Sequence, residues 1–140
     1  MFPRLSQDAA ITLGLAGTSI LHARDEHDAA ERWVRVLRLY GLVGVAMQAL
    51  GVGESPLETP SMPPEQRRKP EHVPGVEEVT NRSRDMALQR GAPAVGTIDI
   101  LFACFDLYGS AFERALYVRG TSRDELLERL AYEVERVPPA

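Results

Sequence analysis

Apolar residues recur every three or four positions along most of this chain, which is the spacing of amphipathic helices. The first such run follows Ser6, a residue type that caps helix N-termini well, and it predicts a helix over about 6–22. Gly14 and Gly17 weaken this helix, each by roughly 1 kcal/mol relative to alanine, unless a neighbouring segment packs closely against them.

The helical pattern continues, with one long interruption. A second helix is predicted from Asp28, as its N-cap, to Gly41, and a third over 42–50. The interruption holds six of the ten prolines, which remove backbone donors and prevent a regular helix. We therefore expect residues 53–74 to be an extended linker, with a proline-rich ligand segment as the alternative.

Four further helices are predicted after the linker, over 76–91, 98–108, 110–118 and 121–136. The apolar composition of 98–108 also suits a buried strand. Its counterpart in the first half carries charges at helical intervals, so we predict the central buried helix here. Thr121 or Ser122, followed three residues later by an acid, is typical of a capping box at the start of the last helix.

The two halves of the chain resemble each other. Leu39-Tyr40-Gly41 recurs as Leu107-Tyr108-Gly109, and 49–51 corresponds to 117–120 with a one-residue slip. Each half is then one helical unit that cannot bury its apolar face alone, so the functional site is expected on the seam between the units. We predict a single all-α domain over 1–140, with about seven to eight helices in two pseudo-symmetric repeats, 1–52 and 75–137, joined by the linker 53–74.

Composition and charge limit the classes of partner. The net charge of -4, with basic residues mixed among acids, argues against nucleic acid, because phosphate binding requires a basic face. No apolar stretch reaches the roughly 20 residues of a membrane span, and Met1-Phe2-Pro3-Arg4 does not begin a signal peptide, so we expect no membrane association and a cytoplasmic location. The single cysteine, Cys104, lies in an apolar run and is predicted to be buried and poorly ionised.

No arrangement of residues indicates an enzyme. The only lysine, Lys69, lies in the linker, and neither a phosphate-binding loop nor a nucleophile elbow is present. His22 and His27, with the acids beside them, lack the spacing of a zinc site, so a solvated acidic loop is preferred over a cation site. Asp106 and Glu113 are single carboxylates, typical of surface charges or caps. The sequence thus predicts no catalytic residue, no metal and no cofactor.

Four segments carry a resemblance to a known family: 1–9, 73–79, 95–101 and 115–120. In order and spacing they look like the N-terminal domain of Clp-type AAA+ unfoldases, over essentially the whole chain. In that family two four-helix repeats pack pseudo-symmetrically, and the second helix of each opens with Gly-Thr-Glu-His. The resemblance implies a Clp N-domain-like bundle that recognises substrates, adaptors or ligands without catalysis.

The resemblance also implies where phosphorylated arginine binds in this family. There the Glu of each motif receives the guanidinium. An ungapped match from Met1 places Glu31 at the first motif, whereas Ile98 stands where the acid belongs in the second. Ile98 cannot make a charge-assisted contact with a guanidinium. Asp99 is one residue along, roughly 100° around the helix, and is expected to point elsewhere.

A second implied ligand site is the family's groove for cyclic peptides, between the first helices of the two repeats. Phe2 and Leu13 fit this groove, although Phe2 alternatively covers the core. Counting back from the second motif, His72 replaces an aromatic residue and Glu77 a basic one; a different anchor would put Gly75 at the aromatic position. The candidate binding residues are Phe2, Leu13, Glu31, His72, Glu77 and Ile98.

The family domain normally precedes ATPase modules, which this sequence lacks, so we expect either an excised domain or, preferably, a free-standing one. The implied partners are a Clp-type AAA+ unfoldase, client peptides including arginine-phosphorylated ones, or cyclic-peptide natural products. Such a protein would act as an adaptor or a decoy in the protease-chaperone system. The alternative is a small helical interaction protein that has lost the ligand site and acts as a homodimeric regulator through its second-repeat surface.

Overall fold

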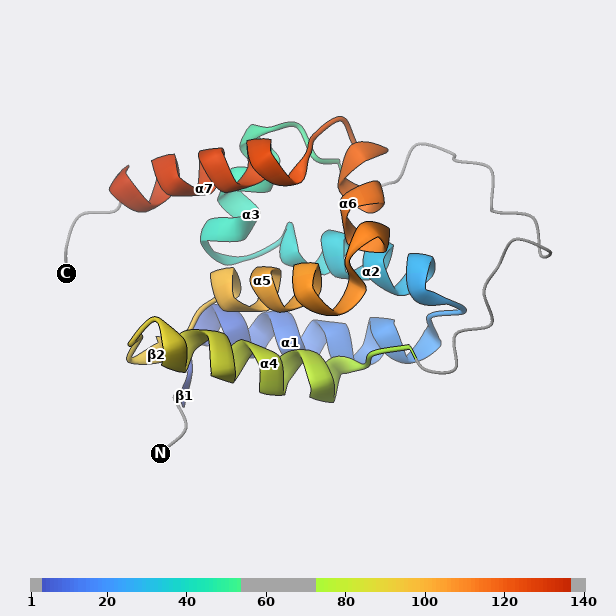
Figure 1. Ribbon diagram of the computed structural model, residues 1–140, viewed down its shortest axis with the longest axis horizontal. Helices are drawn as coiled ribbons and strands as arrows, with labels where there is room; N and C mark the ends of the chain where they lie inside the picture. Colours follow the sequence, from blue (N-terminus) through green and yellow to red (C-terminus); the bar gives the residue numbers. More distant parts are fainter. Residues whose placement is uncertain (1–3, 54–72, 137–140) are drawn as a thin grey trace.

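The computed structural model describes residues 4–53 and 73–136, which form a mostly helical domain (Figure 1). Its helices are α1 (Gln7–Ser19), η1 (Ile20–His22, a 3-10 turn), α2 (Glu26–Leu37), α3 (Gly41–Ala49), α4 (Val76–Gln89), α5 (Thr97–Tyr108), α6 (Ser110–Tyr117) and α7 (Arg123–Arg136). The prediction of a largely helical chain is therefore confirmed. The predicted linker falls, apart from its ends, outside the described residues.

The first helix begins where the sequence predicts. The Ser6 hydroxyl accepts a hydrogen bond from the backbone N–H of Ala9 at 3.1 Å, which satisfies one of the free donors of the first turn of α1. Just before it, β1 (Arg4–Leu5) pairs in parallel with β2 (Ala94–Val95). These two-residue strands carry no period of their own, so the sequence pattern gave no sign of them.

The start of α2 differs from the prediction. Its N-cap is Asp25, not Asp28: one carboxylate oxygen of Asp25 accepts from the backbone N–H of Asp28 at 2.8 Å. Two aspartates stand three residues apart and either suits a cap, so local sequence could not choose between them. The helix also ends at Leu37, before the predicted Gly41.

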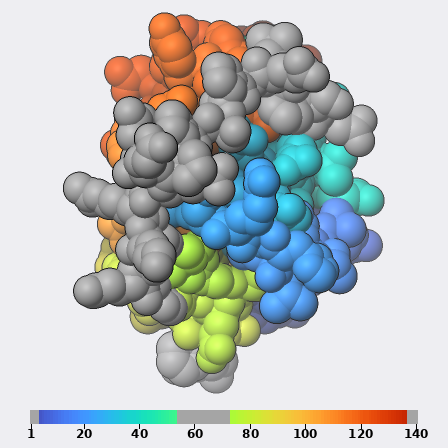
Figure 2. All heavy atoms as spheres, turned by 90° about the vertical axis from the view of Figure 1, so that its right-hand side faces the viewer, coloured from blue at the N-terminus to red at the C-terminus, as the bar shows by residue number. Residues whose placement is uncertain are grey.

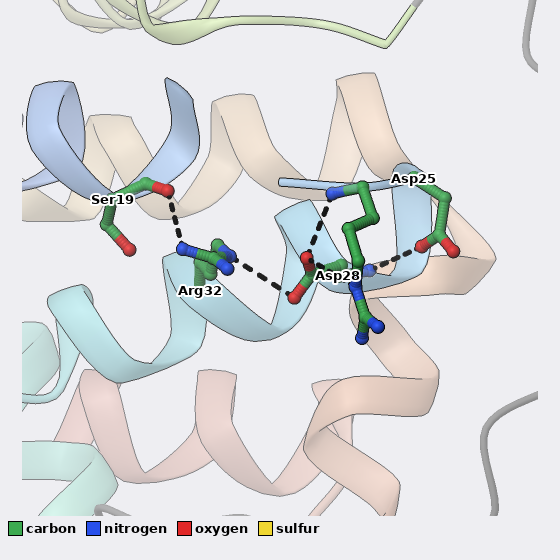
Figure 3. Close-up of polar contacts among 5 residues, drawn as sticks. Ser19, Asp25, Asp28 and Arg32 are labelled. Atoms are coloured by element: carbon green, nitrogen blue, oxygen red, sulfur yellow. Dashed lines mark hydrogen bonds and ion pairs between the residues drawn. The ribbon is translucent and has the colours of Figure 1, made fainter. Parts of the chain in front are cut away.

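Asp28 and Arg32 together connect the start of α2 to the end of α1 (Figure 3). It accepts hydrogen bonds from the backbone N–H of Arg24 at 2.9 Å and from Nε of Arg32 at 3.2 Å, while Nη1 of Arg32 donates to the carbonyl of Ser19 at 2.8 Å. Burial alone would raise the pKa of Asp28, but the hydrogen bonds from Arg24 and Arg32 outweigh it and the pKa is lowered. Within the described residues no group of three metal-ligating side chains comes together, here or elsewhere.

Helix α5 lies in the middle of the molecule, as predicted, and packs against α1, α2, α3, α4 and α6 (Figure 1). Within it Cys104 is fully buried, and burial raises the pKa of its thiol, as the sequence predicts. At its end, the indole N–H of Trp33 donates to the hydroxyl of Tyr108 at 3.0 Å, and that hydroxyl donates to the carbonyl of Pro74. The start of the second half is thereby tied to the core.

The remaining helices surround α5. In Figure 1, α1 and α4 run along one edge, α3 and α7 pack together at the opposite edge, and α6 crosses the end. Figure 2 shows α2 between α6 above it and the start of α4 below it. The largest fully buried side chains come from both halves of the chain: Trp33, Leu37, Met47, Ile100, Leu101, Tyr108, Phe112, Leu116, Leu126 and Leu130. Among the described residues, no helix has both the length and the apolar character needed to cross a bilayer.

Alanine at Gly14 and Gly17 is expected to stabilise the protein. A Cβ added at either position meets nothing within 4 Å, so no neighbour requires a glycine there. The double substitution should raise the free energy of unfolding by about 1–2 kcal/mol, because each alanine restores helix propensity. Urea denaturation followed by circular dichroism measures this gain. A loss of stability would show that the backbone of α1 needs close approach at these positions.

Candidate functional site

A pocket of about 320 Å³ lies where the first turns of α1, α3 and α5 meet. It is lined by Ser6 and Asp8 from the start of α1, Gly41 and Leu42 from α3, Gly96, Thr97 and Ile98 from α5, Arg90 from the end of α4, and Val134 from α7. Segments far apart in the sequence thus build one site. A volume near 300 Å³ is at the small end of the range for ligand pockets.

The floor of the pocket depends on a close approach between α3 and α5. Gly41 has φ +72°, and a Cβ built on it would stand 2.6 Å from Oγ1 and 2.8 Å from Cγ2 of Thr97. Both the backbone conformation and the space therefore favour glycine. This contact sets the distance between the first turns of the two helices.

One side of the pocket is fixed by an ion pair between α4 and α5. The guanidinium of Arg90 holds both carboxylate oxygens of Asp99, each at 2.7 Å, and the backbone N–H of Gly96 donates to the same carboxylate at 2.9 Å. Asp99 is fully buried, whereas about half of the Arg90 side chain is exposed. The hydrogen bond with Asp99 raises the pKa of Arg90. Asp99 thus caps α5 and orients Arg90.

The lining combines apolar and charged side chains. Leu42, Ile98 and Val134 supply apolar surface, and Asp8 and Arg90 supply charge at its edge. The lining residues that the structure describes include no histidine, cysteine or lysine, and the Ser6 hydroxyl is engaged as a helix cap. We infer that the pocket can hold one apolar side chain, with polar groups of the same ligand beside Asp8 and Arg90.

The structure separates the binding residues that the sequence nominated. Ile98 is half-buried and lines the pocket, but Leu13 is 7% exposed and belongs to the core. Glu31 lies half-buried in the second turn of α2, since that helix begins at Glu26. Glu77 is exposed in the first turn of α4. Phe2 and His72 lie outside the described residues.

A second, smaller pocket of about 270 Å³ lies between α4, α5 and the start of α7. Its lining includes Met86, Phe102 and Phe105, and the guanidinium of Arg123 stands 5.1 Å from the ring centre of Phe105. Asp106, also in the lining, forms a half-exposed ion pair with an arginine of α4 at 3.2 Å. The interpretation of Asp106 as a surface charge is therefore confirmed.

Sequence reasoning missed Arg90 and Gly41 as parts of the site. An arginine before a glycine turn usually remains in solvent, and nothing local shows that Arg90 reaches a carboxylate nine residues later. Gly41 was recognised as a turn residue, but its contact with Thr97 joins segments 56 positions apart, which only the packing reveals. The Asp99 cap has a local sign, because it stands three residues after Gly96.

Comparison with models of protein families found no match, and a search of curated proteins found none that is significantly similar.

Proposed function

We propose that this chain is a non-enzymatic recognition domain of the Clp protease-chaperone type, which binds a short segment of a client or partner protein at the pocket beside Ile98. The observation that carries the proposal is the pocket itself, an apolar recess with charged edges that three helix starts and α7 build together. Its partner class is the one that the resemblance implies: peptides, cyclic peptides or a Clp-type AAA+ unfoldase.

The turn glycines support the proposed two-repeat architecture. Gly41 and Gly109, which occupy matching places in the repeated sequence, both have positive φ, at +72° and +53°. The same holds for the next pair, Gly51 and Gly120, at +80° and +85°. Glycine is favoured wherever the backbone turns this way after or before a helix. At two helix connections, the matching positions of the proposed repeats thus carry a glycine with positive φ.

The proposal can be tested by calorimetric titration of the full chain. Three probes are needed: a peptide with phosphorylated arginine, a cyclic peptide that targets Clp proteins, and a Clp hexamer. We expect heat from at least one of them. Ile98→Glu should lower the affinity for an apolar ligand by at least about tenfold, because a carboxylate would be desolvated on binding. The same change should strengthen the phosphoarginine peptide, since it supplies a partner for the guanidinium.

Leu88→Glu is the matched control. Leu88 is 58% exposed on α4 and lies outside the pocket lining, so this change adds the same charge without touching the site. Its affinities should equal those of the unchanged protein. Absence of heat with all three probes would contradict the proposal, as would equal losses in the two variants.

The second candidate function is the homodimeric regulator. It is favoured by four large side chains with apolar surface that are exposed in the second half of the chain: Leu88, Tyr117, Tyr132 and Val134. Surfaces of this kind mark protein interfaces when they are contiguous. Sedimentation velocity over a wide range of concentrations tests the idea, and a monomer throughout would contradict it.

A further inference from the structure

Arg119 is a buried cation whose hydrogen-bonding capacity is only partly used. It follows the last turn of α6 and is 7% exposed. Its Nη1 donates to the carbonyl of Ala115 at 2.8 Å, which satisfies one free carbonyl at the end of the helix. Its Nε and Nη2 are buried and have no hydrogen-bond partner among the residues described. Buried donors are nearly always paired in folded proteins, so this pair of atoms requires an explanation.

The unused atoms form the edge of a guanidinium that grips two oxygens at once. Arg90 shows the same edge in use: its Nε and Nη2 hold the two carboxylate oxygens of Asp99 at 2.7 Å each. Such two-pronged contacts are the preferred way in which arginine binds carboxylate or phosphate. Arg119 therefore presents the same donor pair that Arg90 uses, but no described residue supplies an acceptor for it.

Among the described residues, those that act on Arg119 leave an excess of positive charge around it. Burial lowers the pKa of Arg119, whereas the carboxylate of Glu31 raises it and the guanidinium of Arg35 lowers it further. Both side chains belong to α2, which packs against α6. The Nε of Arg35 and the hydroxyl of Thr121, in the turn after α6, are likewise buried and have no hydrogen-bond partner within residues 4–53 and 73–136. Within the part of the chain that the structure describes, one carboxylate and one further guanidinium thus act on Arg119. Because Glu31 and Arg35 are only half-buried, solvent reaches the edge of this cluster.

We propose that Arg119 and Arg35 form a binding site for an oxyanion, a phosphate or carboxylate group with two acceptor oxygens, where α2 meets the end of α6. The bound group would accept from Nε and Nη2 of Arg119 and from Nε of Arg35, and it would balance the excess charge. None of these residues lines the pocket beside Ile98, so the site is separate from the one that carries the proposed function.

The test uses thermal unfolding of the full chain in inorganic phosphate, in acetate and in chloride at equal ionic strength. Phosphate at about 10 mM should raise the unfolding midpoint by about 3 °C or more over chloride, because only the folded state holds the site. A rise in acetate as well shows that any two-oxygen acceptor is bound, whereas a rise in phosphate alone assigns the site to phosphoryl groups. No rise in either salt would overturn the proposal.

Substitutions test whether the rise in the unfolding midpoint comes from binding at Arg119 and Arg35. Arg119→Met should abolish the rise, and Arg119→Lys should reduce it, since an ammonium keeps the charge but not the two-pronged edge. If Arg119→Met does not fold, Arg35→Met provides the same test from the half-buried side of the cluster. Arg82→Met is the matched control, because Arg82 is half-exposed on α4 and should leave the rise unchanged. An equal rise in the Arg119 and Arg35 variants would show that phosphate acts elsewhere and that only water fills the cluster.

Discussion

Replacing Asp99 with alanine is expected to lower the free energy of unfolding by about 3 kcal/mol. The carboxylate is fully buried, caps α5 through the N–H of Gly96, and accepts two hydrogen bonds from Arg90. Alanine removes all three contacts and leaves a gap at the start of the central helix. The loss is moderated because half of the Arg90 side chain already reaches solvent. Urea denaturation monitored by circular dichroism gives the value.

Asp106→Ala is the matched control for this prediction. Asp106 also pairs with an arginine of α4, but both partners, Asp106 and Arg82, are nearly half-exposed. Ion pairs of that kind contribute little, so this substitution should cost no more than about 0.5 kcal/mol. Equal costs for the two aspartates would show that burial and helix capping do not determine the role of Asp99.

Alanine in place of Gly41 is expected to destabilise the fold by a similar amount, about 3 kcal/mol. Two causes combine: the positive φ of +72° disfavours any side chain, and the new methyl group would stand 2.6 Å from Oγ1 of Thr97. The first turns of α3 and α5 would have to separate. Because Gly41 and Thr97 both line the pocket, ligand affinity should fall together with stability.

Two comparisons separate these causes. Gly51 has φ +80° but nothing within 4 Å of an added Cβ, so Gly51→Ala should show the backbone cost alone, about 1 kcal/mol. Adding Thr97→Ala to Gly41→Ala removes the two closest atoms and should recover part of the loss. A double-mutant cycle measures this recovery. If the effects of the two changes simply add, the contact between Gly41 and Thr97 does not limit the fold.

Helix positions could be predicted because the signals for them are local. Ser6 caps α1 through its own neighbour three residues on, and the apolar face of 98–108 is visible in the sequence itself. Where two local signals compete, as with Asp25 and Asp28, the other contacts of each residue decide: Asp28 accepts from Arg24 and Arg32, which leaves the cap to Asp25.

The candidate site could be predicted only in part, because a pocket is a property of packing. Ile98 was nominated, and it lines the pocket. Leu13 has the residue type of a groove side chain, yet the turn of α1 directs it into the core. Glu31 was nominated from an ungapped match to the family motif. In the structure α2 begins at Glu26, so its second residue is His27, and Ile98 is the second residue of α5. Arg119 gave no signal, since only burial distinguishes it from a surface arginine.

The hydrogen bond between Trp33 and Tyr108 provides an optical reporter within the molecule. Trp33 is the only tryptophan, and its fully buried indole contacts a tyrosine of the other half of the chain, which in turn holds Pro74. Separation of the two halves would expose the indole to water and break its contact with the phenol. Emission from this single fluorophore therefore follows the docking of the halves without any attached label.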